Sequence, residues 1–284
     1  MEVRLDNLGL WSSDHEFKVM AEHLKEYAAA TNDTITAHAS GELAPPLFAV
    51  VPQSWIDPSD RTGQRDRPAL AMSDDETMRV LHGEQDIVFH QPIRPGMVLR
   101  SRLATVGVHG KRTGTTVTIR LETTDADDQP VNTQHMTLFY RGVQTPESAG
   151  AASPTRPAAP DGTVPLAIVT RRLDADQTFR YAKASGDHMP IHLDDEVARG
   201  VGLPGIIVHG LCTLAVASQA VVREVADGDS TRLKRLGVRF SDVVLPEQQI
   251  TTTISRVSPL ACSFVTTNES GTAVLTNGYA EVAA

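Results

Sequence analysis

Hydrophobic and polar residues recur along the chain with two different periods, and together they predict two similar series of elements. Apolar residues three and four positions apart, typical of helices, cover residues 14–30 and 176–184, and Asp174 or Asp176 is expected to cap the second helix. A nearly continuous apolar run that begins at His209 predicts a buried helix of about 15 residues. Runs rich in Val, Thr, Ile and Leu predict strands at about 80–90, 98–109, 113–123 and 131–141, and again at about 232–241, 248–257, 261–267 and 272–283. A helix followed by antiparallel strands, present twice, indicates an α+β fold.

The two series of elements are related by a nearly constant offset. Residues 27–33 align with residues 181–187 at an offset of 154, and His38 aligns with His192 at the same offset. A second block that begins at Val88 matches the second series at an offset of 151. Two independent blocks at nearly the same spacing predict an internal duplication.

A segment rich in Pro and Ala separates the two copies. It has neither helical nor strand periodicity, which is typical of a linker. We therefore expect a first domain over residues 1–142, a linker over 143–165 and a second domain over 166–284. The two domains are called the first half and the second half below.

The charge balance excludes several classes of function. The 284 residues include 26 basic and 35 acidic residues, for a net charge of -9, so we expect no nucleic-acid partner and no anionic membrane partner. The longest nearly apolar stretch, 211–222, is shorter than the roughly 20 residues that a bilayer requires. The N-terminus lacks the pattern of a secretory signal. Cys212 and Cys262 form no CxxC pattern, so we expect a reduced, cytoplasmic protein without a disulfide framework.

The densest group of polar residues lies between Ser185 and His192. It can be read as an ordinary loop, in which Gly186 ends a helix and Pro190 stiffens a turn. The spacing of Asp187 and His192 also suits a carboxylate and an imidazole that hold a water and move its protons. Further along the chain, the first backbone amides of the apolar helix are suited to stabilise an oxyanion.

This segment resembles a known motif. Tyr181-x-x-Ala-Ser-Gly-Asp187-x-Met-Pro190-Ile-His192-x5-Ala198 is similar to the hydratase 2 motif of MaoC-like R-specific enoyl-CoA hydratases and 3-hydroxyacyl-thioester dehydratases, and the stretch 208–213 resembles that family's signature at the start of its central helix. The resemblance implies a double hot dog fold, which consists of two tandem domains with a long antiparallel sheet wrapped around a central helix. It also implies a hydro-lyase that adds water reversibly, in syn fashion, to a trans-2-enoyl thioester and forms the R-3-hydroxyacyl product.

The resemblance assigns roles to individual residues. It implies no metal and no other cofactor, a coenzyme A or acyl-carrier-protein thioester as substrate, and a homodimer as the assembly. The site residues that it implies are Asp187, His192 and Gly210 as catalytic groups, and His209, Met189, Ser185 and Gly186 as substrate-binding groups.

Two departures from the family pattern matter for function. The family usually has Asn where this chain has Met189, and a thioether cannot replace the hydrogen bonds of an amide. The first half keeps Asp33 and His38 at the catalytic spacing but has no counterpart of Gly210, so it is expected to shape an acyl pocket rather than to catalyse. His82, which precedes a glycine, is interpreted as a coincidental match to the His-Gly pair of the second half.

Two alternatives remain open at this stage. A hot dog thioesterase would require a carboxylate on the central helix, which has no acidic residue before Glu224. A non-catalytic acyl-binding subunit would explain Met189 as decay of the site. The sequence leaves open the acyl chain length, the thioester carrier, the pathway and which of Asp187 and His192 activates water.

Overall fold

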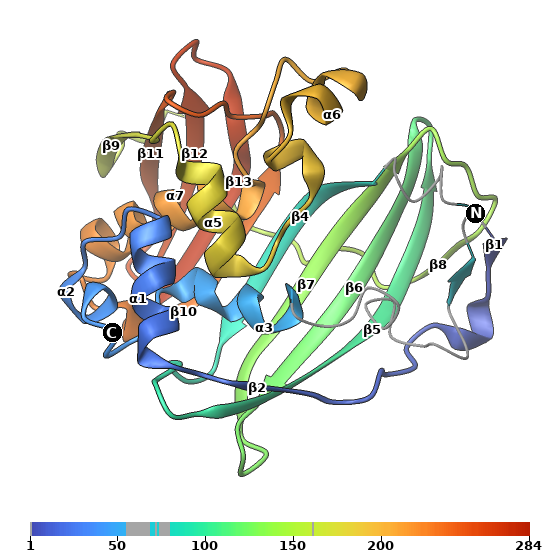
Figure 1. The fold of residues 1–284 in the computed structure, drawn as a ribbon, viewed down its shortest axis with the longest axis horizontal. Helices are drawn as coiled ribbons and strands as arrows, with labels where there is room; N and C mark the ends of the chain where they lie inside the picture. Colours follow the sequence, from blue (N-terminus) through green and yellow to red (C-terminus); the bar gives the residue numbers. More distant parts are fainter. Residues whose placement is uncertain (1, 55–68, 72, 74–79, 161) are drawn as a thin grey trace.

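The computed structural model describes residues 2–54, 69–71, 73, 80–160 and 162–284. Their backbone forms one eleven-stranded antiparallel sheet in the order β2-β5-β6-β7-β4-β10-β13-β12-β11-β9, with β8 attached to β5, and a separate pair of short strands, β1 and β3 (Figure 1). The strands are β1 Glu2–Val3, β2 His15–Lys18, β3 Leu70–Ala71, β4 Val80–Phe89, β5 Val98–Lys111, β6 Gly114–Thr124, β7 Pro130–Arg141, β8 Ser148–Gly150, β9 Ala167–Arg172, β10 Leu233–Phe240, β11 Gln249–Ser258, β12 Ala261–Asn268 and β13 Ala273–Val282. All eight of the long strands predicted from the sequence are confirmed.

The sheet is continuous because β4 of the first half pairs with its counterpart β10 of the second. In this antiparallel pair Asp86 lies directly opposite Gly237, and the two residues are separated by 151 positions, the offset of the sequence repeat. A Cβ atom on Gly237 would lie 2.4 Å from Oδ2 of Asp86. Arg235 donates to both oxygens of this carboxylate at 2.9 and 3.0 Å. A glycine is therefore needed where the two copies meet, because a buried carboxylate and its cation fill the space.

Arg156 joins the segment between the halves to this carboxylate. Its side chain is 4% exposed, and its guanidinium lies 3.3 Å from Asp86 Oδ2 and 2.5 Å from Glu84 Oε2. The same segment contributes β8, which pairs with β5 although its sequence shows no strand periodicity. Residues 143–160 are thus attached to the sheet.

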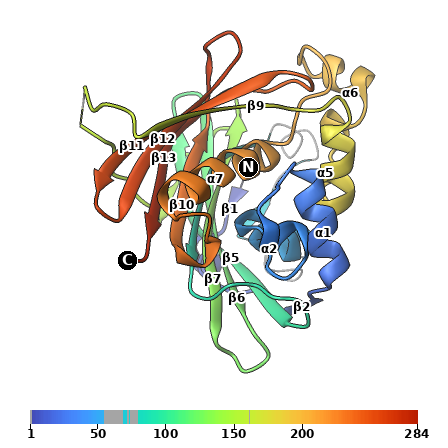
Figure 2. The same ribbon diagram turned by 90° about the vertical axis from the view of Figure 1, so that its left-hand side faces the viewer.

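The helices gather on one side of this sheet (Figure 2). The longest, α7, is buried over all of residues 212–222 and packs against β9, β10, β11 and β13, which confirms the predicted central helix. The α-helices are α1 Ala21–Ala30, α2 Thr36–Ala39, α3 Val51–Ser54, α5 Gln177–Ser185, α6 Asp195–Gly200 and α7 Gly210–Val225, and the 3-10 helices are η1 Leu5–Asn7, η2 Pro46–Val50, η3 Pro190–His192 and η4 Ser230–Arg232. No helix of the described ranges is both long enough and apolar enough to cross a bilayer.

Helices α1 and α5, which are counterparts in the repeat, contact each other across the two halves. The hydroxyls of Tyr27 and Tyr181, separated by the repeat offset of 154, lie 3.4 Å apart. Gln177 of α5 donates to the carbonyl of Ala30 at 2.6 Å. Both tyrosine side chains are fully buried or nearly so. The duplicated halves therefore share one core through equivalent residues.

One local prediction is wrong and another holds only in part. The helix predicted over residues 14–30 begins only at Ala21, because residues 15–18 form β2 and pair with β5. Asp176 is the N-cap residue of α5, but neither its side chain nor that of Asp174 makes a capping hydrogen bond. Both carboxylates instead accept hydrogen bonds from Arg180, at 2.5 and 3.0 Å.

Candidate active site

The loop after α5 fixes the candidate carboxylate. Gly186 ends the helix at φ +79°, a left-handed conformation that glycine adopts without strain. The Asp187 amide donates to Oγ of Ser185 at 3.2 Å, and Oδ1 of Asp187 accepts from the Met189 amide at 3.2 Å. Ser185 is 1% exposed and Met189 is 39% exposed. One oxygen of Asp187 is thus held by the backbone, and the sequence-predicted residues of this loop lie together.

His192, at the end of η3, is fixed in a defined tautomer. Its Nδ1–H donates to the carbonyl of Ile207 at 2.8 Å, which leaves the lone pair on Nε2. Thr178 holds the backbone of the same residue through its hydroxyl and the His192 carbonyl. The side chain is buried, and this removal from water lowers its pKa below the usual value. A neutral imidazole with a free lone pair can accept a proton.

His209 lies directly against His192. The two rings are stacked with centroids 3.7 Å apart and an interplanar angle of 24°. Nε2–H of His209 donates to the backbone carbonyl of Asp187 at 3.0 Å. Burial, reinforced by the neighbouring His192, lowers the pKa of His209 to about 3. The ring is 1% exposed, so it supports the loop of Asp187 and the face of His192 from behind.

Gly210 is the first residue of α7, next to these two histidines. The first amide that bonds within the helix ladder is that of Thr213, which donates to the His209 carbonyl at 3.0 Å. The ladder therefore does not use the Gly210 amide, which stands at the positive end of the helix dipole. A Cβ atom at this position would lie 3.0 Å from the ring of Phe240. The ring makes glycine the residue that fits here and closes one side of the site.

The side chains of Asp187, His192 and His209 converge. A carboxylate oxygen and one nitrogen from each ring all lie within 4.8 Å of one another. These ligand types suit a divalent metal, but a metal lies about 2.0–2.1 Å from a nitrogen, in the plane of the ring that binds it. Two stacked rings cannot place one ion in both planes, so this geometry favours proton chemistry over chelation.

His82 of the first half also reaches the candidate site, although the sequence suggested no role for it. The ring lies 4.7 Å from that of Phe240, and Nε2 is 3.1 Å from Oε1 of Gln85. Burial lowers the pKa of His82 to about 4, and the negative charge of Asp187 acts in the opposite direction. The repeat offset aligns His82 with Leu233, but antiparallel pairing of β4 with β10 carries it to the other end of that strand. The register in which β4 pairs with β10, rather than the alignment of the two halves, places His82 beside Phe240.

The pair Asp33 and His38 of the first half is arranged differently. Oδ2 of Asp33 accepts from Nδ1–H of His38 at 2.7 Å, and both side chains are buried. Nε2 of His38 lies 2.8 Å from Oγ of Ser230. Pro46 and the residues after it form η2 where the second half has the start of α7. The structure thus brings together Asp187, His192, His209 and Gly210 in one site, whereas the first-half pair is bonded to each other and to Ser230.

Two family descriptions match the chain, one in each half. Residues 157–276 match the MaoC like domain, and residues 38–142 match the MFE-2 hydratase 2 N-terminal domain.

Named relatives and a solved structure agree with these matches. The probable enoyl-CoA hydratase 2 of Dictyostelium discoideum is 30% identical over 209 residues, which cover 72% of this chain and 70% of that protein. The 3-hydroxyacyl-thioester dehydratase Y of Mycobacterium tuberculosis is 28% identical over 229 residues, which cover 80% of this chain and 75% of that protein. The crystal structure of a MaoC-like dehydratase from Phytophthora capsici has a TM-score of 0.86 and 25% identity over 99% of both chains.

Proposed function

Because the chain belongs to the MaoC-like hydratase 2 family, we propose that it catalyses the reversible syn addition of water to a trans-2-enoyl thioester. The product is the R-3-hydroxyacyl thioester. The observation that carries this proposal is the convergence of Asp187, His192 and His209 next to the start of α7, where the helix ladder does not use the Gly210 amide. Hydration needs two groups that move protons to and from water, and one hydrogen-bond donor for the thioester oxygen.

The proton chemistry belongs to Asp187 and His192. The neutral His192 accepts a hydrogen bond from a water at Nε2, because its Nδ1–H is committed to Ile207. Asp187 keeps Oδ2 for the same water, because Oδ1 accepts from the Met189 amide. The two groups take a proton from the water that attacks C3 and deliver a proton to C2 on the same face of the substrate. Syn addition follows from this one-sided arrangement.

The Gly210 amide stabilises the charge that develops on the substrate. Attack at C3 shifts electron density to the thioester oxygen, which becomes enolate-like. An amide at a helix N-terminus donates to that oxygen without a reorganisation cost. Phe240 shields the interaction from water, since it packs where a larger residue at 210 would stand.

His209 and Ser185 are positioning residues in this proposal. Both are 1% exposed, and each holds the backbone of Asp187, at the carbonyl and at the amide. Gly186 provides the turn that directs this loop, and Met189 stands at its exposed side.

The first half forms an acyl pocket and the active unit is a cytoplasmic homodimer. Light scattering coupled to size-exclusion chromatography tests the assembly.

The decisive experiment follows loss of the enoyl absorbance with crotonyl-CoA and with a longer enoyl-CoA. Asp187→Asn and His192→Ala are each expected to lower kcat by about 10²–10⁴-fold, the usual contribution of general acid–base groups. The matched controls are Asp127→Asn in an exposed turn and His109→Ala on β5, which keep the wild-type rate. Chiral analysis of the product is expected to give the R isomer. Acyl-CoA binding without turnover by the wild type would instead support a non-catalytic acyl-binding subunit.

A further inference from the structure

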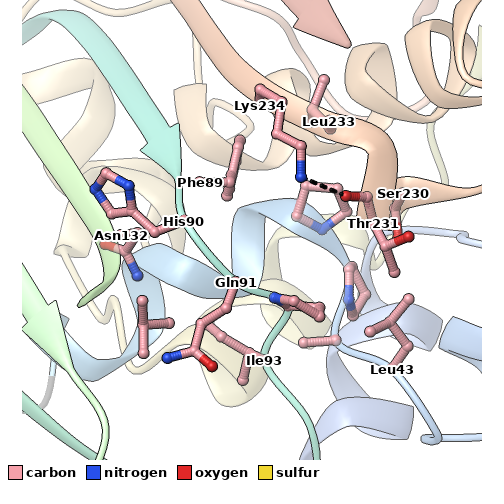
Figure 3. Close-up of a pocket in the computed structure, with 15 residues that line it drawn as sticks. Leu43, Phe89, His90, Gln91, Ile93, Asn132, Ser230, Thr231, Leu233 and Lys234 are labelled. Atoms are coloured by element: carbon pink, nitrogen blue, oxygen red, sulfur yellow. Dashed lines mark hydrogen bonds between the residues drawn. The ribbon is translucent and has the colours of Figure 1, made fainter. Parts of the chain in front are cut away.

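An open cleft lies beside the first-half pair Asp33 and His38. It is open to solvent over part of its extent. Residues around the end of β4 form one wall, and η4 and the start of β10 form the other (Figure 3). The proposed hydration site does not use this cleft.

The cleft is the counterpart, in the first half, of the candidate site in the second. Phe89 in its wall corresponds to Phe240 at the repeat offset of 151, and Lys234 in the opposite wall corresponds to Gly83 at the same offset. His38 corresponds to His192. The cleft thus occupies, in the first half, the position at which the second half would bind an acyl thioester.

Three side chains at this cleft form a relay of hydrogen bonds. Asp33 Oδ2 accepts from Nδ1–H of His38 at 2.7 Å, and His38 Nε2 lies 2.8 Å from Oγ of Ser230. Since Nδ1 donates to the carboxylate, Nε2 holds the lone pair and accepts from the serine hydroxyl. Ser230 itself lines the cleft, whereas Asp33 and His38 are buried behind it. Carboxylate, imidazole and hydroxyl in this order activate a serine for attack.

Among the described residues, no hydrogen bond occupies Nε2 of His192 in the second half, whereas the first half places a serine hydroxyl on the equivalent nitrogen of His38. We propose that Ser230 is a nucleophile, activated by His38 and Asp33, that accepts an acyl group from an activated ester or thioester bound in this cleft.

The reaction balances in two steps. Oγ of Ser230 forms a bond to the acyl carbon while its proton passes to Nε2 of His38. The bond from the acyl carbon to the alkoxide or thiolate leaving group then breaks, and that group takes the proton from His38. Water then attacks the acyl carbon and passes a proton to His38. The bond from that carbon to Oγ breaks, the carboxylic acid leaves, and Ser230 takes the proton from His38. No oxidant or reductant takes part.

The lining of the cleft defines the class of ligand. The walls include the apolar side chains Leu43, Pro45, Phe89, Ile93, Val131 and Leu233. Asn132 is 2% exposed, and within the described residues its Nδ2 has no hydrogen-bond partner although it lies in the cleft wall. An apolar acyl group with a polar acceptor matches these features.

In the described part of the cleft wall, prolines take the place that Gly210 has in the second half. Pro45 and Pro46 stand in this part of the first half, and proline has no N–H. Attack at a weakly activated carbonyl therefore receives little stabilisation. We expect fast reaction with strong electrophiles such as fluorophosphonates and p-nitrophenyl esters, and slow reaction with crotonyl-CoA.

The test is labelling of the full chain with a fluorophosphonate, read by intact mass and peptide mapping. One adduct is expected, on Ser230, and Ser230→Ala abolishes it together with release of p-nitrophenol from p-nitrophenyl butyrate. The matched control is Ser258→Ala, an exposed serine at the end of β11, which labels as the wild type does. His38→Gln is expected to slow labelling by about 100-fold or more.

Two outcomes overturn the proposal. One is an unmodified Ser230 in protein whose circular dichroism and thermal melting are those of the native fold. The other is a labelling rate that does not depend on His38. If His38→Gln does not fold, Asp33→Asn replaces it: labelling of Ser230 is expected to slow, because the carboxylate that bonds to Nδ1 of His38 is lost, and an unchanged rate contradicts the relay.

Discussion

The two halves contain the same carboxylate and imidazole at the same spacing, yet the two pairs have opposite surroundings. In the second half, backbone groups fix Asp187 and His192 separately, and no hydrogen bond of the described residues joins them. In the first half, Asp33 bonds directly to His38, and both are withdrawn from solvent. A carboxylate and an imidazole act on a substrate only where their remaining lone pairs face it. The hydrogen-bond partners, rather than the spacing, therefore separate a site that holds a water from a pair whose imidazole bonds to Ser230.

The largest expected difference is in stability. His38→Ala leaves Oδ2 of the buried Asp33 carboxylate without its partner, although Oδ1 still accepts from the Ile35 amide, and it is expected to lower the free energy of unfolding by about 3–5 kcal/mol. His192→Ala leaves only the neutral Ile207 carbonyl unpaired, for a loss of about 1–3 kcal/mol. Urea unfolding at neutral pH measures both. Equal losses would mean that the two pairs are alike and would remove the distinction between the halves.

The next prediction concerns the residue that only the second half has. Gly210→Ala places a methyl group about 3.0 Å from the Phe240 ring and displaces the amide or the ring. A shift of this kind in a donor is expected to lower kcat/KM for enoyl hydration by about 10–100-fold.

A double variant distinguishes crowding from other causes. Phe240→Leu in the Gly210→Ala background removes the ring and is expected to restore part of the lost rate. If the double variant is as slow as the single one, contact between the new methyl group and the ring is not the reason for the loss.

The strands and α7 could be predicted from the sequence because their patterns are long and local. Val, Thr, Ile and Leu recur along the long strands, and α7 is apolar around most of its circumference. The start of α1 could not be predicted in this way. Residues 15–18 have helical spacing and become a strand only because they pair with β5, about 80 residues away.

The members of the candidate site could largely be predicted, but their arrangement could not. The motif gave Asp187, His192 and Gly210, whereas the tautomer of His192 depends on the carbonyl of Ile207, 15 residues further along. His82 was missed because its place beside Phe240 follows from the register of β4 against β10. Ser230, beside His38, belongs to no motif and comes from the other half.

The histidines of the second-half site predict how stability depends on pH. The folded-state pKa values of His209, about 3, and His82, about 4, lie below the usual 6.5, so the unfolded chain binds more protons between those limits. These histidines therefore make their full contribution to the free energy of unfolding above about pH 6.5, and the contribution falls as the pH drops towards 4. His82→Gln is expected to reduce this slope by about one proton, as measured by urea unfolding from pH 7.5 to pH 4.5. An unchanged slope would show that His82 titrates alike in both states.

The smallest expected effect concerns Met189, where the family usually has Asn. Met189 already donates its backbone amide to Asp187 Oδ1, and its side chain is 39% exposed at the open side of the loop. Met189→Asn adds a side-chain amide there, and one hydrogen bond worth about 0.5–1.5 kcal/mol raises kcat by about 2–12-fold. The matched control is Met189→Leu, which adds no hydrogen-bonding group and keeps the wild-type rate. If Asn and Leu act alike, the second half reaches its full rate through the backbone of this loop, whereas the Asp33–His38 pair of the first half is held through its side chains and Ser230.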